Sequence, residues 1–220
     1  MPDLPDRDSY FTLWSGQHGG YDPRGAFWPR TWLTLTYHCA RPLARRRVPP
    51  GAVTVAGGSL SGLAVGLAVL GGRWALPAVA VVVGSGLLDN LDGAVAALTD
   101  RVTAFGYVLD SVVDRLSDGC YLVALWQLGA PAWLCLLGGL VTMLQEYLRA
   151  RAGNAGMGEL GVVTIAERPT RVIITAFALC AAGVVPVHAG PVATAGAAVW
   201  LATGMVGFAQ LSVAVGRALR

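Results

Sequence analysis

Six long apolar runs dominate this sequence, and each is about as long as a helix that crosses a membrane. A helix needs roughly 20 consecutive apolar residues to span the hydrocarbon core of a bilayer. Of the 220 residues, 55% are hydrophobic and only 13% are charged, whereas soluble domains carry about 25% charged residues. We therefore predict an all-α integral membrane protein, a six-transmembrane-helix bundle with spans near residues 53–71, 75–98, 104–128, 131–150, 170–187 and 192–214.

The basic residues are all arginines, and their placement along the chain predicts its orientation in the membrane. Arginines precede the first predicted span, lie between spans two and three and between spans four and five, and follow the sixth. The opposite side shows only Arg73. Because loops rich in arginine face the cytoplasm, we expect both termini on the cytoplasmic side of a multi-pass protein of the cell membrane.

The first 47 residues differ in composition from the rest, which predicts a cytoplasmic arm with an interfacial helix (1–47) and a transmembrane domain (48–220). Residues 1–30 are rich in Gly, Pro and Asp, which is typical of a flexible or loosely docked segment. Residues 31–47 combine aromatic side chains with a basic end, which favours an N-terminal amphipathic helix in the membrane interface. An ordinary basic lead-in to the first span is the alternative.

Four aspartates interrupt the second and third predicted spans, where carboxylates are costly. Asp89 and Asp92 are three residues apart and Asp110 and Asp114 are four apart, so each pair shares one face of its helix. The short polar turn between the two helices makes them antiparallel neighbours. We therefore expect the four carboxylates to converge near the cytoplasmic ends of both helices.

Converging carboxylates repel one another unless cations hold them. Oxygen ligands suit hard divalent ions, and two Mg²⁺ or Mn²⁺ ions would offset four negative charges. Carboxylates without a function and a cation transporter are the other interpretations. A transporter needs polar residues along a path across the bilayer, but the runs VIITAFALCAAGVVPV and VATAGAAVWLATGMVGFAQL of spans five and six carry no charge. The pattern favours an active site at the membrane surface.

Around these carboxylates the sequence resembles the signature of the CDP-alcohol phosphatidyltransferase family. The resemblance rests on the pattern Asp89-x2-Asp92-Gly93-x2-Ala96-x9-Gly106-x3-Asp110-x3-Asp114. It extends over roughly residues 48–215, because the number and order of the predicted spans also fit. The resemblance implies a metal-dependent transferase of phospholipid biosynthesis that moves a phosphatidyl group from CDP-diacylglycerol to an alcohol and releases CMP.

The resemblance also implies roles for individual residues. Asp89, Asp92 and Asp110 would ligate metal, and Asp114 would contact the second metal and act as general base on the acceptor hydroxyl. The residues expected to bind the nucleotide-linked donor are Thr54, Gly93, Ala96, Arg101 and Gly106.

Two positions depart from the family pattern. Ala97 stands where the family usually has an arginine that helps to hold the nucleotide diphosphate, and Gly51 stands where asparagine is common. Arg101 lies one helical turn after Ala97 in the predicted helix, and we hypothesise that it substitutes for that arginine. A catalytically impaired or non-enzymatic relative is the alternative.

Arginines flank the loop between the fourth and fifth predicted spans. Membrane anchoring is one interpretation; because Arg binds phosphate in bidentate fashion, a phosphorylated acceptor is the other. The runs ARA and ERP-x-R are similar to those of actinobacterial phosphatidylinositol phosphate synthases of this family, which implies inositol 1-phosphate as acceptor. A phosphatidylglycerophosphate synthase, with glycerol 3-phosphate as acceptor, and a cardiolipin synthase are the alternatives. The predicted acceptor-binding residues are Arg149, Arg151, Arg168 and Arg171.

Three further features receive simpler interpretations. Asp118 is expected to be a charge at a loop or helix end, and Glu146 is expected either to bond across the bundle or to order the arginines. Gly58, Gly62 and Gly66 lie four residues apart, which favours close helix packing within the bundle or in a homodimer. Analogy with the family also implies a homodimer.

Overall fold

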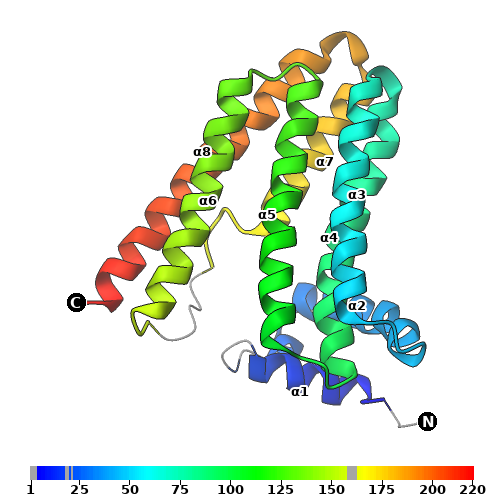
Figure 1. Cartoon of the computed structure of the whole chain (residues 1–220), viewed down its shortest axis with the longest axis vertical. Coiled ribbons are helices and arrows are strands. Elements are labelled where there is room, and N and C mark those ends of the chain that lie inside the picture. The colour runs from blue at the N-terminus through cyan, green and yellow to red at the C-terminus, as the bar shows by residue number, and fades with distance from the viewer. Residues whose placement is uncertain (1–3, 18–19, 21, 158–162) are drawn as a thin grey trace. The chain divides into compact units, whose positions relative to one another are not determined.

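The structure is all-helical, as the composition predicted. It is a computed structural model that describes residues 4–17, 20, 22–157 and 163–220, and in these residues there is no strand (Figure 1). The α-helices are α1 (Arg7–Gln17), α2 (Phe27–Arg45), α3 (Pro50–Leu70), α4 (Ala75–Leu98), α5 (Ala104–Gln127), α6 (Ala132–Asn154), α7 (Arg168–Val184) and α8 (Ala189–Ala218). Short 3-10 helices lie at Pro23–Gly25, Gly72–Trp74 and Pro186–His188.

The six predicted spans coincide with helices α3 to α8, but the helices are not equally suited to a bilayer. Among the described residues, three helical stretches are long and apolar enough to cross a membrane: Pro50–Leu70, Gly72–Leu98 and Pro186–Ala218. α5 carries four charged residues within its apolar sequence, and α7 has only 17 residues. The membrane character is therefore supported, whereas the count of six spans stays a prediction.

Local sequence signals explain where several helices begin and end. Pro50 is the first residue of α3, a position at which proline's missing N–H has no helical partner to lose. Thr103 caps α5, because its side-chain oxygen accepts a hydrogen bond from the Gly106 N–H at 3.0 Å. Gly129 follows α5 with φ of 110°, and a Cβ at this glycine would lie 2.9 Å from the Gly190 Cα.

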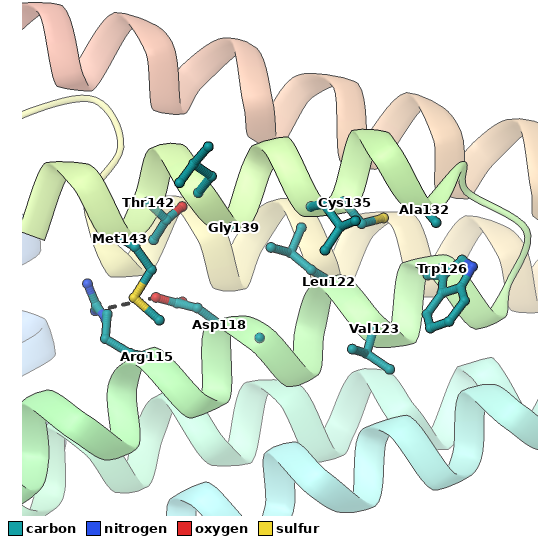
Figure 2. A pocket seen from close by; sticks show the side chains of 13 residues that line it. Arg115, Asp118, Leu122, Val123, Trp126, Ala132, Cys135, Gly139, Thr142 and Met143 are labelled. Atoms are coloured by element: carbon teal, nitrogen blue, oxygen red, sulfur yellow. Dashed lines mark ion pairs between the residues drawn. The ribbon is translucent and has the colours of Figure 1, made fainter.

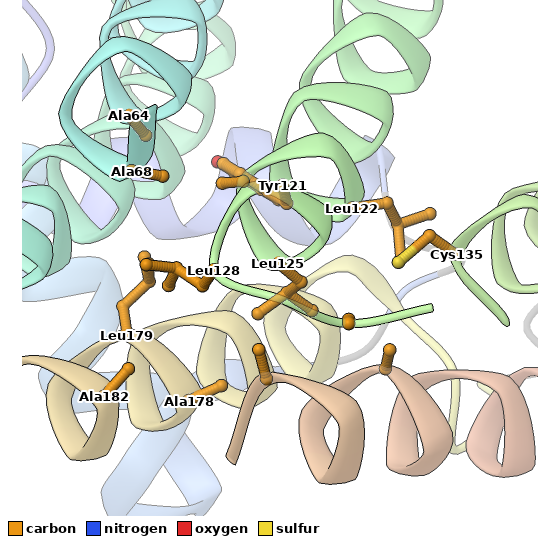
Figure 3. Packing of buried hydrophobic residues seen from close by; sticks show 14 of the residues in the cluster. Ala64, Ala68, Tyr121, Leu122, Leu125, Leu128, Cys135, Ala178, Leu179 and Ala182 are labelled. Atoms are coloured by element: carbon orange, nitrogen blue, oxygen red, sulfur yellow. The ribbon is translucent and has the colours of Figure 1, made fainter. Parts of the chain in front are cut away.

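The chain forms two compact units. The first comprises residues 1–58 and 85–114, and the second comprises residues 59–84 and 115–220. In the second unit, α8 packs along α6 and α7 (Figure 1). Its core joins Tyr121, Leu125 and Leu179 to many alanines (Figure 3), whose small side chains let helices approach closely.

The core of the first unit is aromatic and includes the N-terminal segment. Tyr10 and Phe11 of α1 are each only 2% exposed, and they pack in one cluster with Tyr37 of α2 and Leu91 and Val95 of α4. This burial corrects the expectation of a flexible or loosely docked arm. The glycine, proline and aspartate content of the segment concealed the apolar positions that hold α1 in place.

Helix α2 presents apolar side chains on its outer face as well. Phe27, Trp32 and Leu35 are exposed, and the helix ends before Pro49, so α2 and α3 are separate helices. An exposed apolar face is compatible with a helix that lies in the membrane interface. That location stays a prediction.

The predicted glycine row has a packing role at one of its positions. A Cβ on Gly58 would lie 2.7 Å from Cγ1 of Val113, so α3 and α5 approach closely there. At Gly62 and Gly66 a Cβ would meet no described atom within 4 Å. Gly58 therefore serves packing within the chain.

Candidate metal and nucleotide site

Three of the four predicted carboxylates converge in the first unit. Asp89 on α4 and Asp110 and Asp114 on α5 each offer an oxygen within 4.8 Å of the others, and all three side chains are half-buried. The spacing of four residues places both aspartates of α5 on one face. Carboxylates this close repel one another when ionised, and their oxygens are the ligands that Mg²⁺ and Mn²⁺ prefer. The donor set therefore fits a divalent cation.

Asp92 is held differently from the other three. It is 6% exposed, and its Oδ2 accepts a hydrogen bond from the Thr54 hydroxyl at 2.5 Å. Its Oδ1 accepts from the backbone N–H of Gly93 at 2.6 Å. Thr54, predicted to contact the nucleotide, thus fixes the direction of a predicted metal ligand. Hydrogen bonds of this kind orient the ligands of metal sites.

Thr54→Val should weaken metal binding while it preserves the shape of the side chain. The substitution removes the hydroxyl that orients Asp92, and outer-shell partners contribute about 10- to 100-fold to metal affinity. We expect the Kd for Mn²⁺, measured by calorimetry in detergent, to rise about tenfold. Thr54→Ser keeps the hydroxyl and should bind like the wild type. Equal affinities for all three proteins would contradict the role of Thr54.

A cavity of about 190 Å³ adjoins the carboxylates. Asp89, Asp92 and Asp110 line it, and Gly93 leaves open space, because a Cβ there would meet no described atom within 4 Å. Tyr10 of α1 also lines the cavity, and burial raises the pKa of its phenol to about 12. The remaining lining residues are Trp14, Leu33, Thr36, Asn90, Ala94 and Ala97.

The helical placement assumed for Arg101 was wrong. α4 ends at Leu98, so Arg101 does not follow Ala97 by a further turn of the helix, and its side chain is exposed. Its backbone N–H donates to the Ala96 carbonyl at 2.9 Å and closes the helix end. Gly106 lies in the first turn of α5, next to its cap. The donor-binding roles of Ala96, Arg101 and Gly106 stay predictions.

The second unit contains a partly buried network of ion pairs that joins α5, α6 and α7. Oδ2 of Asp118 lies 3.2 Å from Arg171 Nη1 and 3.3 Å from Arg115 Nη2. Asp118 is 3% exposed and lies in the middle of α5. The interpretation of Asp118 as a charge at a loop or helix end was therefore wrong. Buried carboxylates require such partners.

Glu146 extends this network along α6. Its Oε1 lies 2.8 Å from Arg115 Nη1 and 3.8 Å from Arg171 Nη2, and its Oε2 lies 3.8 Å from Arg149 Nε. Both roles left open for Glu146 fit these ion pairs: Glu146 bonds across the bundle to α5 and α7, and it thereby orders the arginines. Sequence reasoning missed Arg115. A charged residue inside an apolar helix between Asp114 and Asp118 was the signal that could have found it.

Glu167 anchors the other end of the network. Its Oε1 lies 2.8 Å from Arg149 Nη2 and accepts hydrogen bonds from the N–H and the hydroxyl of Thr164. Burial alone raises the pKa of Glu167, but the Thr164 donors and the Arg149 guanidinium outweigh burial and lower it below the ordinary value. Glu167 therefore stays ionised and fixes the Arg149 guanidinium.

The lowered pKa of Glu167 predicts how stability depends on pH. A carboxyl whose pKa falls on folding stabilises the fold above its unfolded pKa, here about 4.5, and loses that effect as the pH falls through the lowered value. Glu167→Gln should therefore lose less stability than the wild type between about pH 6 and about pH 3. Thermal unfolding in detergent measures this, with exposed Asp100→Asn as control. An identical acid loss in wild type and Glu167→Gln would contradict the prediction.

The four predicted acceptor arginines lie in different surroundings. Arg149 and Arg171 share Glu146 as an ion-pair partner. Arg151 is exposed in the last turn of α6, and Arg168 is the half-buried first residue of α7. Residues 158–162 of the intervening loop lie outside the described residues.

A larger cavity, of about 390 Å³, lies between α5 and α6 of the second unit. Arg115 and Asp118 meet at one end, whereas Leu122, Val123 and Trp126 line its length (Figure 2). This lining is almost wholly apolar, which suits hydrocarbon rather than a nucleotide or a phosphate. The cavity is therefore a poor candidate for the reacting groups.

Apolar helices together with a cluster of carboxylates suited to divalent cations are the features of a metal-dependent membrane enzyme. The chain belongs to the CDP-alcohol phosphatidyltransferase family, whose profile matches residues 47–216. The family predicted from the aspartate spacing is confirmed, and with it the class of enzyme, a transferase of phospholipid biosynthesis.

Curated relatives and solved structures agree with this assignment. The archaetidylinositol phosphate synthase of Methanothermobacter thermautotrophicus is 38% identical over 145 residues, which cover 61% of this chain and 72% of that protein. The phosphatidylinositol phosphate synthase of Mycobacterium marinum is 36% identical over 158 residues, which cover 68% of this chain and 64% of that protein.

The phosphatidylinositol phosphate synthase of Mycobacterium tuberculosis has a similar fold. Its structure with CDP-DAG bound matches with a TM-score of 0.67 at 28% identity, covering 83% of this chain and 94% of that one. A second structure of the same enzyme, in complex with manganese and citrate, matches with a TM-score of 0.67 and covers 82% of this chain and 88% of that one.

Proposed function

We propose that this enzyme transfers the phosphatidyl group of CDP-diacylglycerol to a hydroxyl of inositol 1-phosphate and releases CMP. The observation that carries the proposal is the cluster of Asp89, Asp110 and Asp114, whose oxygens lie within 4.8 Å of one another inside the part of the chain that matches the family. The names of the relatives support the acceptor, because one is an archaetidylinositol phosphate synthase and the other a phosphatidylinositol phosphate synthase, so both products carry an inositol phosphate headgroup.

In this proposal the four aspartates hold two divalent cations, Mg²⁺ or Mn²⁺. The bound cations would stabilise the negative charge on the diphosphate and on the departing CMP. Asp89, Asp92 and Asp110 serve as ligands, and the Thr54 hydroxyl keeps Asp92 in its orientation. The manganese complex of the mycobacterial enzyme supports a divalent cation without deciding between the two metals.

Asp114 has a second role in the proposed reaction. The acceptor oxygen forms a bond to the phosphorus of the phosphatidyl group, the bond from that phosphorus to CMP breaks, and CMP leaves with the electron pair. The hydroxyl proton passes to the Asp114 carboxylate. A carboxylate is a weak base, so correct positioning supplies much of the rate.

The arginines of the second unit are proposed to bind the phosphate of the acceptor. Arg149 and Arg171 are pre-oriented, because Asp118, Glu146 and Glu167 hold their guanidinium groups by ion pairs. A planar guanidinium that is already fixed loses less rotational freedom when it binds phosphate. The proposed site adds Arg151 and Arg168.

The membrane arrangement belongs to the same proposal. Helices α3 to α8 form six spans over residues 48–220, and residues 1–47 form a cytoplasmic arm with α2 in the interface. The carboxylates lie on the cytoplasmic side of the cell membrane, where the soluble acceptor arrives, while the lipid donor enters from the bilayer. Two copies form a homodimer. Charged residues on α5 and the arginine-bearing loops support this orientation.

The experiment that tests the function is release of CMP by the purified enzyme in detergent. CDP-diacylglycerol is supplied with Mn²⁺ or Mg²⁺ and with inositol 1-phosphate, glycerol 3-phosphate, inositol or phosphatidylglycerol. We expect CMP release with inositol 1-phosphate and with none of the other three acceptors. Chelation of the metal should abolish this release, and return of the metal should restore it. Release with glycerol 3-phosphate instead would change the acceptor, and no release with any acceptor would overturn the function.

A further inference from the structure

Helix α1 lies outside the residues that match the family profile, yet it forms part of the carboxylate cavity. The profile begins at residue 47, whereas Tyr10 and Trp14 line the cavity together with Asp89, Asp92 and Asp110. The cavity is therefore lined by carboxylates from α4 and α5 and by aromatic residues from α1.

Several contacts hold α1 in this position. Asp6 caps the helix, because its Oδ1 accepts a hydrogen bond from the Ser9 N–H at 2.8 Å. Arg24 Nη2 donates to the Asp8 carbonyl at 2.8 Å and to the Thr12 hydroxyl at 3.0 Å, which ties α1 to the segment that follows it. Together with the burial of its aromatic residues, these contacts make α1 a fixed wall.

These two kinds of lining residue match the two chemical parts of a nucleotide. A diphosphate needs the cations that the carboxylates would hold, whereas a pyrimidine base needs a flat, partly apolar surface. The half-buried Trp14 offers an indole ring, and aromatic rings stack on bases of any sequence. On the α4 side the small Ala97 and the open space at Gly93 leave the cavity unfilled.

We propose that Trp14 contacts the nucleotide base of the lipid donor, so that the N-terminal helix α1 is part of the donor site. Tyr10 is almost fully buried and packs against Phe11 and Tyr37, so it stabilises the position of α1 and is not proposed to contact the nucleotide base. The inference rests on the proposed function for the identity of the donor. It predicts that loss of the Trp14 ring weakens nucleotide binding and leaves the affinity for the acceptor unchanged.

The test compares three variants of the full chain in detergent. Trp14→Leu keeps an apolar side chain in the cluster and removes the ring, whereas Trp14→Phe keeps a ring. Leu13→Ala is the matched control, because Leu13 directly precedes Trp14 in α1 and is 43% exposed. The measurements are the Kd of CMP in the presence of Mn²⁺ by calorimetry, the KM values for CDP-diacylglycerol and for inositol 1-phosphate, and the thermal unfolding midpoint.

We expect Trp14→Leu to raise the Kd of CMP and the KM for CDP-diacylglycerol about tenfold, since loss of one stacked aromatic typically weakens binding by that order. Trp14→Phe and Leu13→Ala should stay within about twofold of the wild type, and the acceptor KM should not change. Unchanged CMP binding in Trp14→Leu, or an equal loss in Leu13→Ala, overturns the inference. If the wild type releases no CMP from any acceptor, the proposed function fails, while CMP binding still decides the role of Trp14.

Discussion

Asp114→Asn is expected to reduce CMP release about a thousandfold while the protein remains folded. The amide has nearly the shape of the carboxylate, but it accepts no proton and carries no charge for a cation. Asp114 lies within 4.8 Å of Asp89 and Asp110, so both of its proposed roles depend on the same oxygens. The measurement is the initial rate of CMP release with CDP-diacylglycerol, Mn²⁺ and inositol 1-phosphate.

A metal-binding measurement separates the two roles of Asp114. If Asp114 acts chiefly as the base, the variant binds Mn²⁺ with nearly the affinity of the wild type and still lacks turnover. If it acts chiefly as a ligand, the affinity falls along with the rate. Asp100→Asn is the control, because Asp100 is exposed with φ of 54°, a backbone conformation that asparagine tolerates well. Retained turnover in Asp114→Asn would rule out the proposed base.

Asp118→Asn is expected to destabilise the protein by about 3 kcal/mol or more. Asp118 and Arg171 have side chains that are each 4% exposed, and removal of one partner leaves a buried guanidinium without its nearest counter-charge. Arg115 loses the same partner. Unfolding in detergent measures the loss of stability, and the KM for inositol 1-phosphate should rise, because Arg171 is no longer held.

A double variant distinguishes stability from acceptor binding. Asp118→Leu combined with Arg171→Met replaces the buried ion pair by apolar side chains, which is often neutral or stabilising, and the pair of Arg115 with Glu146 remains. We expect stability to return to within about 1 kcal/mol of the wild type. The acceptor KM should nevertheless stay about tenfold raised, because a phosphate-binding guanidinium is lost. A normal acceptor KM in the double variant would exclude Arg171 from the acceptor site.

The sequence was a good guide wherever the evidence is local. Apolar runs of span length predicted α3 to α8, because a segment that must satisfy its backbone hydrogen bonds without water becomes a helix wherever it lies. The spacing of Asp110 and Asp114 predicted that both share one face, because the helical period depends only on the backbone. The same regularity produced one error, at Arg101, where the helix ends three residues earlier than the extrapolation required.

Contacts between distant segments were decided by the tertiary structure. The ion pair of Asp118 with Arg171, the hydrogen bond from Thr54 to Asp92 and the packing of α1 against Leu91 and Val95 all join residues far apart in the chain. Residue spacing predicts which face of a helix a side chain occupies. It does not predict which helix that face meets, because that choice depends on burial and charge pairing summed over the folded chain.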